Sequence, residues 1–388
     1  MRILQIHNSY LLGGGEDAVV AAERRLLTEY GHDVTIFSVS NEDEISSPLS
    51  KIKTAWFAPY SKRMKLKLKA LLADVKPDVV HVHNFFPLIT ASVYDACREA
   101  GVPVVQTLHN YRLICPGALL MRDGKICEEC LGHSPYHSVL HRCYRGSRLG
   151  TLAVARMVAT HKKLRTWHTK VDRFIALTEF ARAKFIADGF PADKIAVKPN
   201  FAPIQGAGSR SGERSGALFV GRLSEEKGVQ TLLESWTDMT SVLRIIGEGP
   251  LHDEARIQNR ANVDLLGART SSEVMAAMSA SEFLVTPSLC YEGFPMVIVE
   301  AFSCGLPVIA SCLGAMAEII EDGVTGLLFS PGDAQDLAAK VRWAFEHPEE
   351  MLRMGQNARK VYHLHYTPEE NCRQLIAIYE LAIGERLQ

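Results

Sequence analysis

Short apolar runs alternate with longer segments of helical periodicity along the chain, in two series. This alternation is typical of βαβ units, and the almost continuous Val, Ile, Leu and Phe content of the runs indicates strands covered by helices on both faces. The first series of predicted strands is Arg2 to His7, Val34 to Val39, Asp78 to His83, Val102 to Thr107, Arg173 to Leu177 and Lys194 to Lys198. The second series is Ala217 to Val220, Val242 to Ile246, Val263 to Leu266, Glu282 to Thr286 and Leu306 to Ala310. The pattern predicts an α/β protein with two doubly wound domains.

A Gly/Ser-rich stretch without periodic apolar content separates the two series and predicts a flexible linker. We therefore expect an N-terminal Rossmann-like domain over residues 1–200, a linker over 201–216 and a C-terminal Rossmann-like domain over 217–365. Residues 366–388 are amphipathic at helical spacing and predict a final helix.

The composition is that of an ordinary globular protein, with 388 residues, 47% of them hydrophobic and 22% charged. The net charge of −1 argues against a dedicated nucleic-acid binder. This total hides an asymmetry, because residues 1–199 hold 28 Lys and Arg against 19 Asp and Glu, whereas residues 200–388 hold 15 against 25. The basic first half indicates that an anionic surface or ligand meets it.

The amino terminus begins with a short apolar run that His7 and Asn8 interrupt, which is too brief for the apolar core of a signal peptide. We expect a cytoplasmic protein whose nine cysteines stay reduced. No stretch of about 18 consecutive apolar residues occurs, so we expect any membrane contact to be peripheral.

Two glycine-bearing turns follow predicted strands. The first, with Gly14 and Gly15, leads into a helix and indicates either close approach to a phosphate or sugar, or simply a tight βα turn. The second contains Arg222 and Lys227, five residues apart. A guanidinium and an ammonium at this spacing can bracket a diphosphate, although a solvated charged loop is the ordinary alternative.

A pair of carboxylates marks the most informative segment, which runs from Thr286 to Ala301. Pro295 fits the first turn of a helix, so that Glu300 lies within the helix and Glu292 lies in the loop before it. Glu300 follows Met-Val-Ile-Val, and a carboxylate in such apolar surroundings is costly unless a group hydrogen-bonds it. The loop, its glycine and the second carboxylate favour a ligand site over a paired structural residue.

Together these motifs resemble the GT-B glycosyltransferases of family 4. The resemblance rests on V-G-R-L-x-x-x-K-G with Arg222 and Lys227, on E-x7-E with Gly-Phe-Pro inside it, and on the Gly-rich first turn. It spans nearly the whole chain and is strongest over residues 217–330. It implies two Rossmann-like domains facing a central cleft, with the last helix packing back on the N-terminal domain.

The resemblance implies a retaining hexosyltransferase that uses a nucleoside-diphosphate sugar and needs no catalytic divalent metal. By position, Arg222 and Lys227 hold the diphosphate, and Glu300 binds the ribose hydroxyls. The transferred hexose is gripped by Glu292 and by the backbone of Gly293, Phe294 and Pro295. The resemblance further places Gly247 beside the nucleoside, Gly14 and Gly15 near the phosphates, and His109 as a catalytic residue on the acceptor side. Without the resemblance, His109 would be read as a structural histidine.

The resemblance also suggests a saccharide or lipid-linked saccharide acceptor and a role in polysaccharide or lipopolysaccharide synthesis at the inner face of the membrane. Two alternatives are a nucleotide-sugar epimerase and a non-catalytic nucleotide-sugar binding protein on the same fold. A dinucleotide dehydrogenase is disfavoured because the G-x-G-x-x-G fingerprint is missing.

Residues 112–148 form an insertion that carries four cysteines, Cys115, Cys127, Cys130 and Cys143. Four thiolates around a central C-x2-C could bind a structural zinc ion, whereas the alternative is a set of unrelated reduced thiols. Three histidines of the insertion, His133, His137 and His141, are rival ligands.

Residues 61–72 are rich in lysine, and Met64, Leu68, Leu71 and Leu72 fall on one helical face. An anionic bilayer would attract this charge while the apolar stripe docks on it. The commoner outcome is that such a stripe packs on the protein core.

Overall fold

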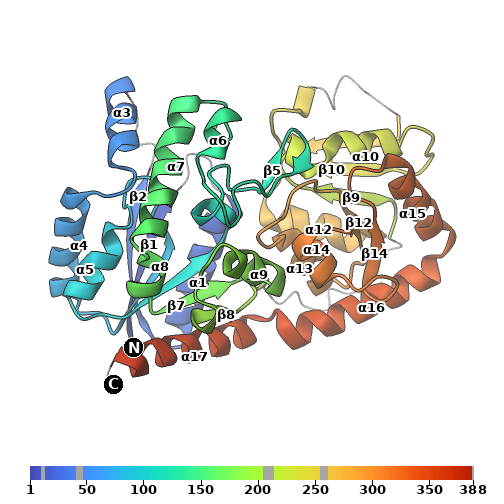
Figure 1. The fold of residues 1–388 in the computed structure, drawn as a ribbon. Coiled ribbons are helices and arrows are strands. Elements are labelled where there is room, and N and C mark those ends of the chain that lie inside the picture. The colour runs from blue at the N-terminus through green and yellow to red at the C-terminus, as the bar shows by residue number, and fades with distance from the viewer. Residues whose placement is uncertain (10–13, 41–46, 204–213, 254–260, 387–388) are drawn as a thin grey trace. The chain divides into compact units, whose positions relative to one another are not determined.

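The computed structural model describes residues 1–9, 14–40, 47–203, 214–253 and 261–386, and these divide into two compact units (Figure 1). The first unit comprises Met1–Leu120, Glu128–Pro199 and Asn371–Gln388, and the second comprises Met121–Cys127 and Asn200–Glu370. Most of the expected linker lies outside the described residues. Part of the cysteine-bearing insertion, Met121–Cys127, groups with the second unit, whereas we expected the whole insertion in the first.

The first unit is built on a parallel six-stranded sheet. Its strands, in spatial order, are β2 (Asp33–Ser40), β1 (Arg2–Ser9), β3 (Val79–Asn84), β4 (Val104–Leu108), β7 (Arg173–Ala176) and β8 (Ile195–Val197). The order reverses between β1 and β3, so a topological switch point lies there. Ligands of doubly wound sheets bind at the carboxyl ends of strands near such a point.

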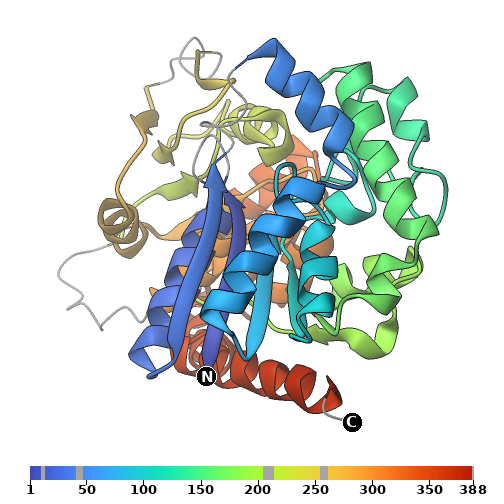
Figure 2. The ribbon, with the colours of Figure 1, turned by 90° about the vertical axis from the view of Figure 1, so that its left-hand side faces the viewer.

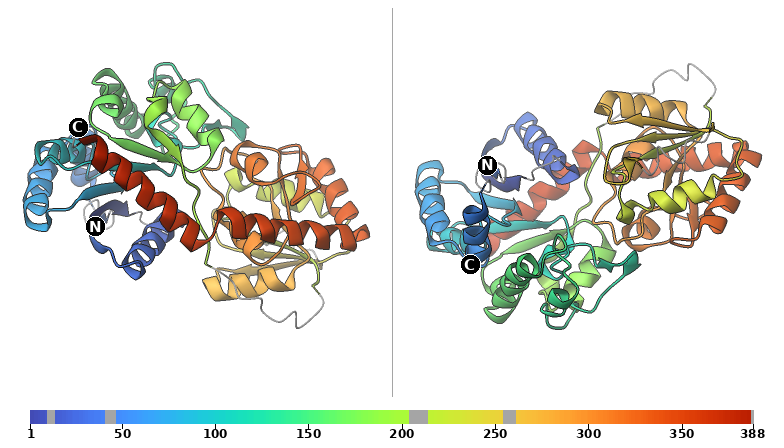
Figure 3. Two further views of the ribbon diagram at one scale, coloured as in Figure 1. Left: turned by 90° about the horizontal axis from the view of Figure 1, so that it is seen from below. Right: turned by 90° about the horizontal axis from the view of Figure 1, so that it is seen from above.

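Helices surround this sheet. They are α1 (Gly15–Glu29), α3 (Pro48–Phe57), α4 (Lys62–Val75), α5 (Ser92–Glu99), α6 (His137–Leu140), α7 (Arg148–Lys163), α8 (Thr166–Thr169), α9 (Glu179–Ala187) and α17 (Pro368–Arg386). The last of these runs across the first unit (Figure 3). It buries Leu375, Ile378, Tyr379 and Ala382, as its amphipathic pattern predicts.

The second unit contains another parallel six-stranded sheet. Its spatial order is β11 (Val263–Gly267), β10 (Leu243–Ile246), β9 (Ala217–Val220), β12 (Phe283–Thr286), β13 (Val308–Ser311) and β14 (Gly326–Phe329). Its helices are α10 (Val229–Ser235), α12 (Ser271–Ala280), α13 (Met296–Ser303), α14 (Gly314–Ile319), α15 (Ala334–Glu346) and α16 (Pro348–His365). This is the Rossmann order 3-2-1-4-5-6, and its switch point lies between β9 and β12.

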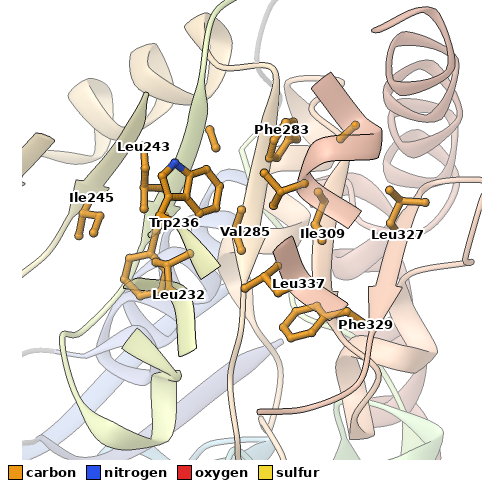
Figure 4. Close-up of a cluster of buried hydrophobic side chains, with 14 of the residues drawn as sticks. Leu232, Trp236, Leu243, Ile245, Phe283, Val285, Ile309, Leu327, Phe329 and Leu337 are labelled. Atoms are coloured by element: carbon orange, nitrogen blue, oxygen red, sulfur yellow. The ribbon is translucent and has the colours of Figure 1, made fainter. Parts of the chain in front are cut away.

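Alternate residues of the second sheet enter two separate cores, one on each face. Ala217 and Phe219 pack with the fully buried Trp236 on one face, whereas Leu218 packs on the other. Figure 4 shows Trp236 among other members of the first core, such as Leu243 and Val285. The Trp236 ring nitrogen donates to the Ser241 carbonyl at 3.0 Å, so this large side chain is buried without an unpaired donor. Coverage of both faces explains why the central strands β9, β12 and β13 are almost wholly apolar.

All eleven predicted strands are present, with shifts of at most two residues at their ends. The sequence analysis missed β14 and the small antiparallel hairpin of β5 (Met121–Arg122) and β6 (Lys125–Ile126). The strand β14 begins at Gly326, where a Cβ atom would lie 2.1 Å from the Val308 carbonyl oxygen. Glycine is therefore needed for β14 to approach β13, and it weakened the strand signal.

The apolar stripe of the basic helix α4 faces the protein interior. Leu68 and Leu72 are 0% and 3% exposed, and α4 packs on α5 (Figure 2). Two of its lysines, Lys65 and Lys69, form ion pairs with Glu99 of α5. Leu68 and Leu72 of the apolar stripe thus belong to the core, whereas Met64 and Leu71 are partly buried.

Candidate functional site

Three loops meet at the carboxyl edge of the second sheet, where its strand order reverses. They follow β9, β10 and β12 and cover residues 221–228, 247–250 and 287–295. Backbone hydrogen bonds join them: the Leu223 N–H donates to the Glu248 carbonyl at 2.9 Å, and the Leu289 N–H donates to the Glu226 carbonyl at 2.9 Å. The predicted residues of the second unit, Arg222, Lys227, Gly247, Glu292, Gly293, Phe294 and Pro295, all lie on these loops.

Two glycines allow the loops to approach this closely. Gly228 has φ +67°, and a Cβ atom there would lie 1.9 Å from the Pro287 carbonyl oxygen. Gly247 has φ +141°, and its Cβ atom would lie 1.9 Å from the Gly221 carbonyl oxygen. Any larger residue would force the loops apart, so these glycines fix the shape of the edge.

Lys227 and Glu292 form an ion pair across the switch point. The Lys227 Nζ lies 2.6 Å from the Glu292 Oε1, to which the Ser288 hydroxyl also donates at 2.7 Å. Burial alone would raise the pKa of Glu292, but the neighbouring ammonium outweighs it and the net pKa is lowered. Burial likewise opposes the charge of Lys227, and Glu292 raises the pKa of this lysine overall. Both groups are therefore charged at neutral pH.

Glu300 is in the opposite situation. It lies in the second turn of α13, partly buried, and within the described residues its carboxylate has no hydrogen-bond or ion-pair partner. Burial raises the pKa of Glu300 for that reason. A partly buried acceptor without donors is suited to receive the hydroxyl groups of a ligand.

Arg222 supplies a second positive charge at the same edge. Its side chain is exposed and forms no ion pair with any residue that the structure describes. Phe294 and Pro295 immediately precede α13, and the Phe294 ring packs edge-to-face on Tyr366 with 6.1 Å between centroids. This contact fixes the backbone before the helix, whose first N–H groups have no intrahelical acceptor. The edge thus offers cations and N–H donors to an anion, and one carboxylate to hydroxyl groups.

His109 follows β4 in the first unit. Its Nε2 lies 3.0 Å from the His83 Nδ1, with the two rings stacked at 5.3 Å between centroids. Burial lowers the pKa of His109 to about 3 and that of His83 well below its usual value. Both imidazoles are therefore neutral at physiological pH, and in their contact one nitrogen donates and the other accepts.

A buried ion pair lies behind these histidines. The Lys198 Nζ is 2.9 Å from the Glu23 Oε1, and the two side chains are 0% and 2% exposed. The other carboxylate oxygen of Glu23 is 3.5 Å from the His83 Nε2. Burial alone would raise the pKa of Glu23, but Lys198 lowers it overall, so this carboxylate is charged.

His81 completes the buried cluster. Tyr379 of α17 contacts its Nδ1 at 2.7 Å, and Thr107 contacts its Nε2 at 2.7 Å. Among the described residues, Glu23, His81 and His83 are the one group of three metal-ligating residues with atoms within 4.8 Å of one another. The Lys198 ammonium already neutralises the Glu23 carboxylate, and hydroxyl groups already contact both ring nitrogens of His81. A divalent cation at this cluster would therefore have to displace the ammonium and a hydroxyl group.

This cluster was missed in the sequence analysis, although signals were present. Glu23 lies on the face of α1 that buries Val19, Val20, Leu26 and Leu27, where a carboxylate needs a partner. His81 and His83 are two residues apart in a buried strand and therefore point to the same side. Lys198 is 175 residues away from Glu23, and only the fold brings it there.

Gly14 and Gly15 lie at the start of α1, whereas their neighbour Gly13 is outside the described residues. Apart from the neighbouring residues and the backbone of α1, no atom of the described residues lies within 4 Å of a Cβ atom built at either position. The Asp17 carboxylate accepts from the Gly14 N–H at 2.9 Å and contacts the His7 Nε2 at 2.8 Å. Packing of this unit therefore does not require glycine here.

The four cysteines of the insertion are buried or partly buried and form no disulfide. A Cβ atom on Gly117 would lie 3.7 Å from the Cys115 sulfur and 3.4 Å from the Cys143 Cβ, so these two residues border the same glycine. No three of the four sulfur atoms lie within 4.8 Å of one another in the described residues. The structural zinc site stays a prediction.

Family models match the chain in both halves. Residues 13–205 match "Glycosyltransferase Family 4" and residues 205–361 match "Glycosyl transferases group 1". The chain belongs to the GT-B glycosyltransferases. Its sheets, both parallel and Rossmann-like, have the layout of this fold.

Individual relatives agree with the assignment. The chain is 26% identical to the MMP alpha-(1->4)-mannosyltransferase of Mycolicibacterium hassiacum, over 96% of this chain and 95% of that protein. It is 30% identical to the phosphatidyl-myo-inositol mannosyltransferase of Mycobacterium leprae, over 45% of this chain and 50% of that protein. The crystal structure of Anabaena Alr3699/HepE in complex with UDP superposes with a TM-score of 0.69 and 20% identity, covering 97% and 99% of the two chains.

Proposed function

We propose that this glycosyltransferase moves a hexose, with retention of anomeric configuration, from a nucleoside-diphosphate sugar to a saccharide or lipid-linked saccharide. One observation carries the assignment of a sugar-nucleotide donor. Around the switch point of the second sheet lie the cations Arg222 and Lys227 and the Glu300 carboxylate, which accepts no hydrogen bond from the described residues. A diphosphate needs the cations, and a ribose needs the carboxylate.

Arg222 and Lys227 would stabilise the leaving diphosphate. Arg222 can hold two phosphate oxygens through its planar fork, and the Lys227 ammonium has three donors, of which Glu292 engages one. Charge that develops on the leaving group would meet preorganised positive groups, which is electrostatic catalysis. The two side chains supply this charge themselves, so the proposal requires no catalytic metal.

The remaining roles follow the chemistry of each group. Glu300 would accept from the ribose hydroxyls, and Glu292 with the Gly293, Phe294 and Pro295 backbone would bind the hexose. Gly247 would border the nucleoside, and Gly14 and Gly15 would leave room for the phosphates. His109, neutral and held by His83, would contact the transferred sugar as a hydrogen-bonding group on the acceptor side.

We further propose a lipid-linked acceptor and a role in cell-surface polysaccharide or lipopolysaccharide synthesis at the inner face of a membrane. Two findings support this. The first half of the chain is basic. The Mycobacterium leprae relative bears the name of an enzyme that acts on phosphatidyl-myo-inositol.

A thermal-shift panel of UDP-, GDP-, ADP- and dTDP-sugars tests the donor assignment. A ligand at about 100 times its Kd adds about 2.7 kcal/mol to the stability of the folded state, which raises the Tm measurably. At least one donor should raise the Tm of the wild type, and Glu300→Gln should reduce that shift. If no donor shifts the Tm, the donor assignment is wrong.

Product analysis separates transfer from its alternatives. With donor and a lipid-linked saccharide extract, a transferase releases the nucleoside diphosphate and forms an α-linked product from an α-linked donor. An epimerase would change the donor without acceptor and release no diphosphate, and a binding protein would leave the donor intact.

A further inference from the structure

Large apolar side chains are exposed on neighbouring helices of the first unit. Six of the fifteen exposed large hydrophobic residues in the described part of the chain lie on α3, α6 and the first turns of α7. They are Ile52 at 68%, Trp56 at 67%, Phe57 at 45%, Leu140 at 72%, Leu149 at 80% and Leu152 at 42% exposed. We call these six residues the α3–α7 surface.

Direct contacts make this a continuous feature. Arg156 of α7 donates to the Trp56 carbonyl oxygen, and its guanidinium lies 5.0 Å from the centre of the Trp56 ring. The helix α6 packs on α7, and the two lie beside α3 in the upper part of this unit (Figure 1). Leu149, Leu152 and Arg156 are spaced three and four residues apart and share one face of α7. The arginine therefore joins the apolar faces of α3 and α7.

The same segments carry positive charge almost exclusively. Residues 47–73 contain seven Lys and Arg and no Asp or Glu, and residues 131–171 contain eight and again no acid. Lys51, Lys53, Arg142, Arg145 and Arg148 are exposed beside the apolar residues. Acids flank the two segments, at Glu44, Asp74, Glu129 and Asp172. Of these, Glu129 contacts His141 at 3.2 Å.

We infer that the α3–α7 surface docks on an anionic phospholipid bilayer. Exposed Trp and Leu can enter the headgroup boundary while flanking Lys and Arg meet lipid phosphates, which is how helices that lie on a bilayer bind. Among the described residues no helix is long and apolar enough to cross a membrane. The contact that we infer is peripheral and uses α3 and α7, whereas the sequence analysis left membrane docking of the α4 stripe open.

Docking deepens the proposed function, because a lipid-linked acceptor lies in such a bilayer. The binding test below uses no sugar donor and no acceptor. Loss of transfer with binding intact would therefore count against the proposed function alone, and loss of binding with transfer intact would count against docking alone.

Vesicle sedimentation measures the binding. The wild type should sediment with vesicles of 30% phosphatidylserine in phosphatidylcholine at low salt, and much less with pure phosphatidylcholine or at 0.5 M salt, where the Debye length falls below about 5 Å. Each basic residue near an anionic surface contributes about 1 kcal/mol, or about fivefold in affinity. Lys51→Gln with Lys53→Gln should therefore weaken binding roughly 30-fold.

Apolar variants test the docking residues themselves. Ile52→Ser with Trp56→Ser, and separately Leu149→Ser with Leu152→Ser, should each weaken binding at least tenfold. The matched controls are Leu364→Ser on α16 and Leu381→Ser on α17, which are 67% and 57% exposed elsewhere. All these side chains are solvent-exposed, so the Tm of each variant should stay near that of the wild type.

Tryptophan fluorescence gives an independent reading. Trp56 is exposed, whereas Trp167 and Trp236 are 5% and 0% exposed. Anionic vesicles should shift the emission to the blue, and Trp56→Phe should remove the shift. Binding that is insensitive to salt, or lost in the Leu364 and Leu381 variants as much as in the α3 and α7 variants, would overturn the inference. The inference would also be overturned if only the α4 variant Lys62→Gln with Arg63→Gln lost vesicle binding. A change of oligomeric state in the α3 variants would overturn it as well, because it would indicate that a second copy of the chain covers this surface.

Discussion

Lys198→Met removes the cation from the buried ion pair with Glu23 and should strongly destabilise the first unit. The Glu23 carboxylate would be left 2% exposed, next to His81 and His83, whose pKa values are held well below their usual range. Neither histidine can replace the lost charge without accepting a proton in a buried environment. The variant therefore keeps the desolvation cost of the carboxylate without its compensation.

The expected magnitude follows from the geometry of the pair. Breaking a buried ion pair by removing one partner costs about 3 to 5 kcal/mol, a large fraction of the 5 to 15 kcal/mol that is typical of a folded domain. Glu23→Gln should cost a similar amount, because it leaves the Lys198 ammonium buried instead. The double variant has no unpaired charge. It should cost less than either single change, and therefore well below the sum of the two.

Urea unfolding followed by hydrogen exchange measures these costs in the first unit. Peptides from β3 and β4 report on the unit that contains the pair, and peptides from β9 and β12 of the second unit serve as an internal reference. Glu29→Gln is the matched control, because it removes a carboxylate of the same helix whose ion pair with Arg25 is exposed at both partners. It should leave protection unchanged. Equal effects of Glu29→Gln and Glu23→Gln, or a double variant as unstable as the sum, would refute the reasoning.

Three further predictions concern the second unit and pH. Glu300→Gln should weaken donor binding roughly 10- to 100-fold in titration calorimetry, because a hydrogen bond to a charged acceptor contributes about 1.5 to 3 kcal/mol. The Tm of the free variant should equal that of the wild type or exceed it. Gly228→Ala should lower the free energy of unfolding more than Gly323→Ala does. Both positions have positive φ, which costs alanine about 1 to 2 kcal/mol. Only at Gly228 would the added Cβ atom also lie 1.9 Å from a carbonyl oxygen. Equal costs would show that the loop contact is unimportant. Between pH 6.5 and 5 the unfolded chain binds protons at His81, His83 and His109, whereas the folded chain keeps them neutral. The free energy of unfolding is therefore full above this range and should fall on acidification, by up to about 1.4 kcal/mol per pH unit for each such histidine. Unfolding curves of the wild type and His83→Asn should show the smaller slope for the variant.

Much of the fold was predictable from the sequence because most of its strands are buried on both faces. Such strands appear as mainly apolar runs whatever their neighbours are, so eleven strands could be located. The strand β14 escaped because it begins with a glycine, which weakens the strand signal. The pairing order of the strands is not contained in any local run, and it emerges only from the assembled sheets.

The candidate site was likewise predictable from the sequence only in part. Arg222, Lys227, Glu292 and Glu300 lie on short segments that follow strands, so spacing alone indicated one pair of cations and one pair of carboxylates. Only the resemblance to family 4 assigned both pairs to one donor. The Glu23–Lys198 pair was missed because its partners are far apart in the chain. The apolar stripe of α4 was left open between core and membrane for a related reason: periodicity shows that a helix has an apolar face, but not whether protein or membrane covers it.

Charge placement leads to a final prediction that separates the two binding tasks. Residues 200–388 hold 15 Lys and Arg against 25 Asp and Glu, so the proposed diphosphate site lies in an acidic half. Exposed acids farther away than about 8 Å are screened at physiological salt, whereas Lys227 and Arg222 would touch the ligand directly. Donor binding should therefore respond weakly to salt. Docking of the α3–α7 surface depends on many exposed cations at some distance from lipid phosphates, and it should fall steeply. Titrations with the sugar nucleotide and with anionic vesicles between 0.05 and 0.5 M salt give the dependence of each affinity on salt. Equal dependences would contradict the conclusion that direct contacts bind the donor and exposed cations bind the bilayer.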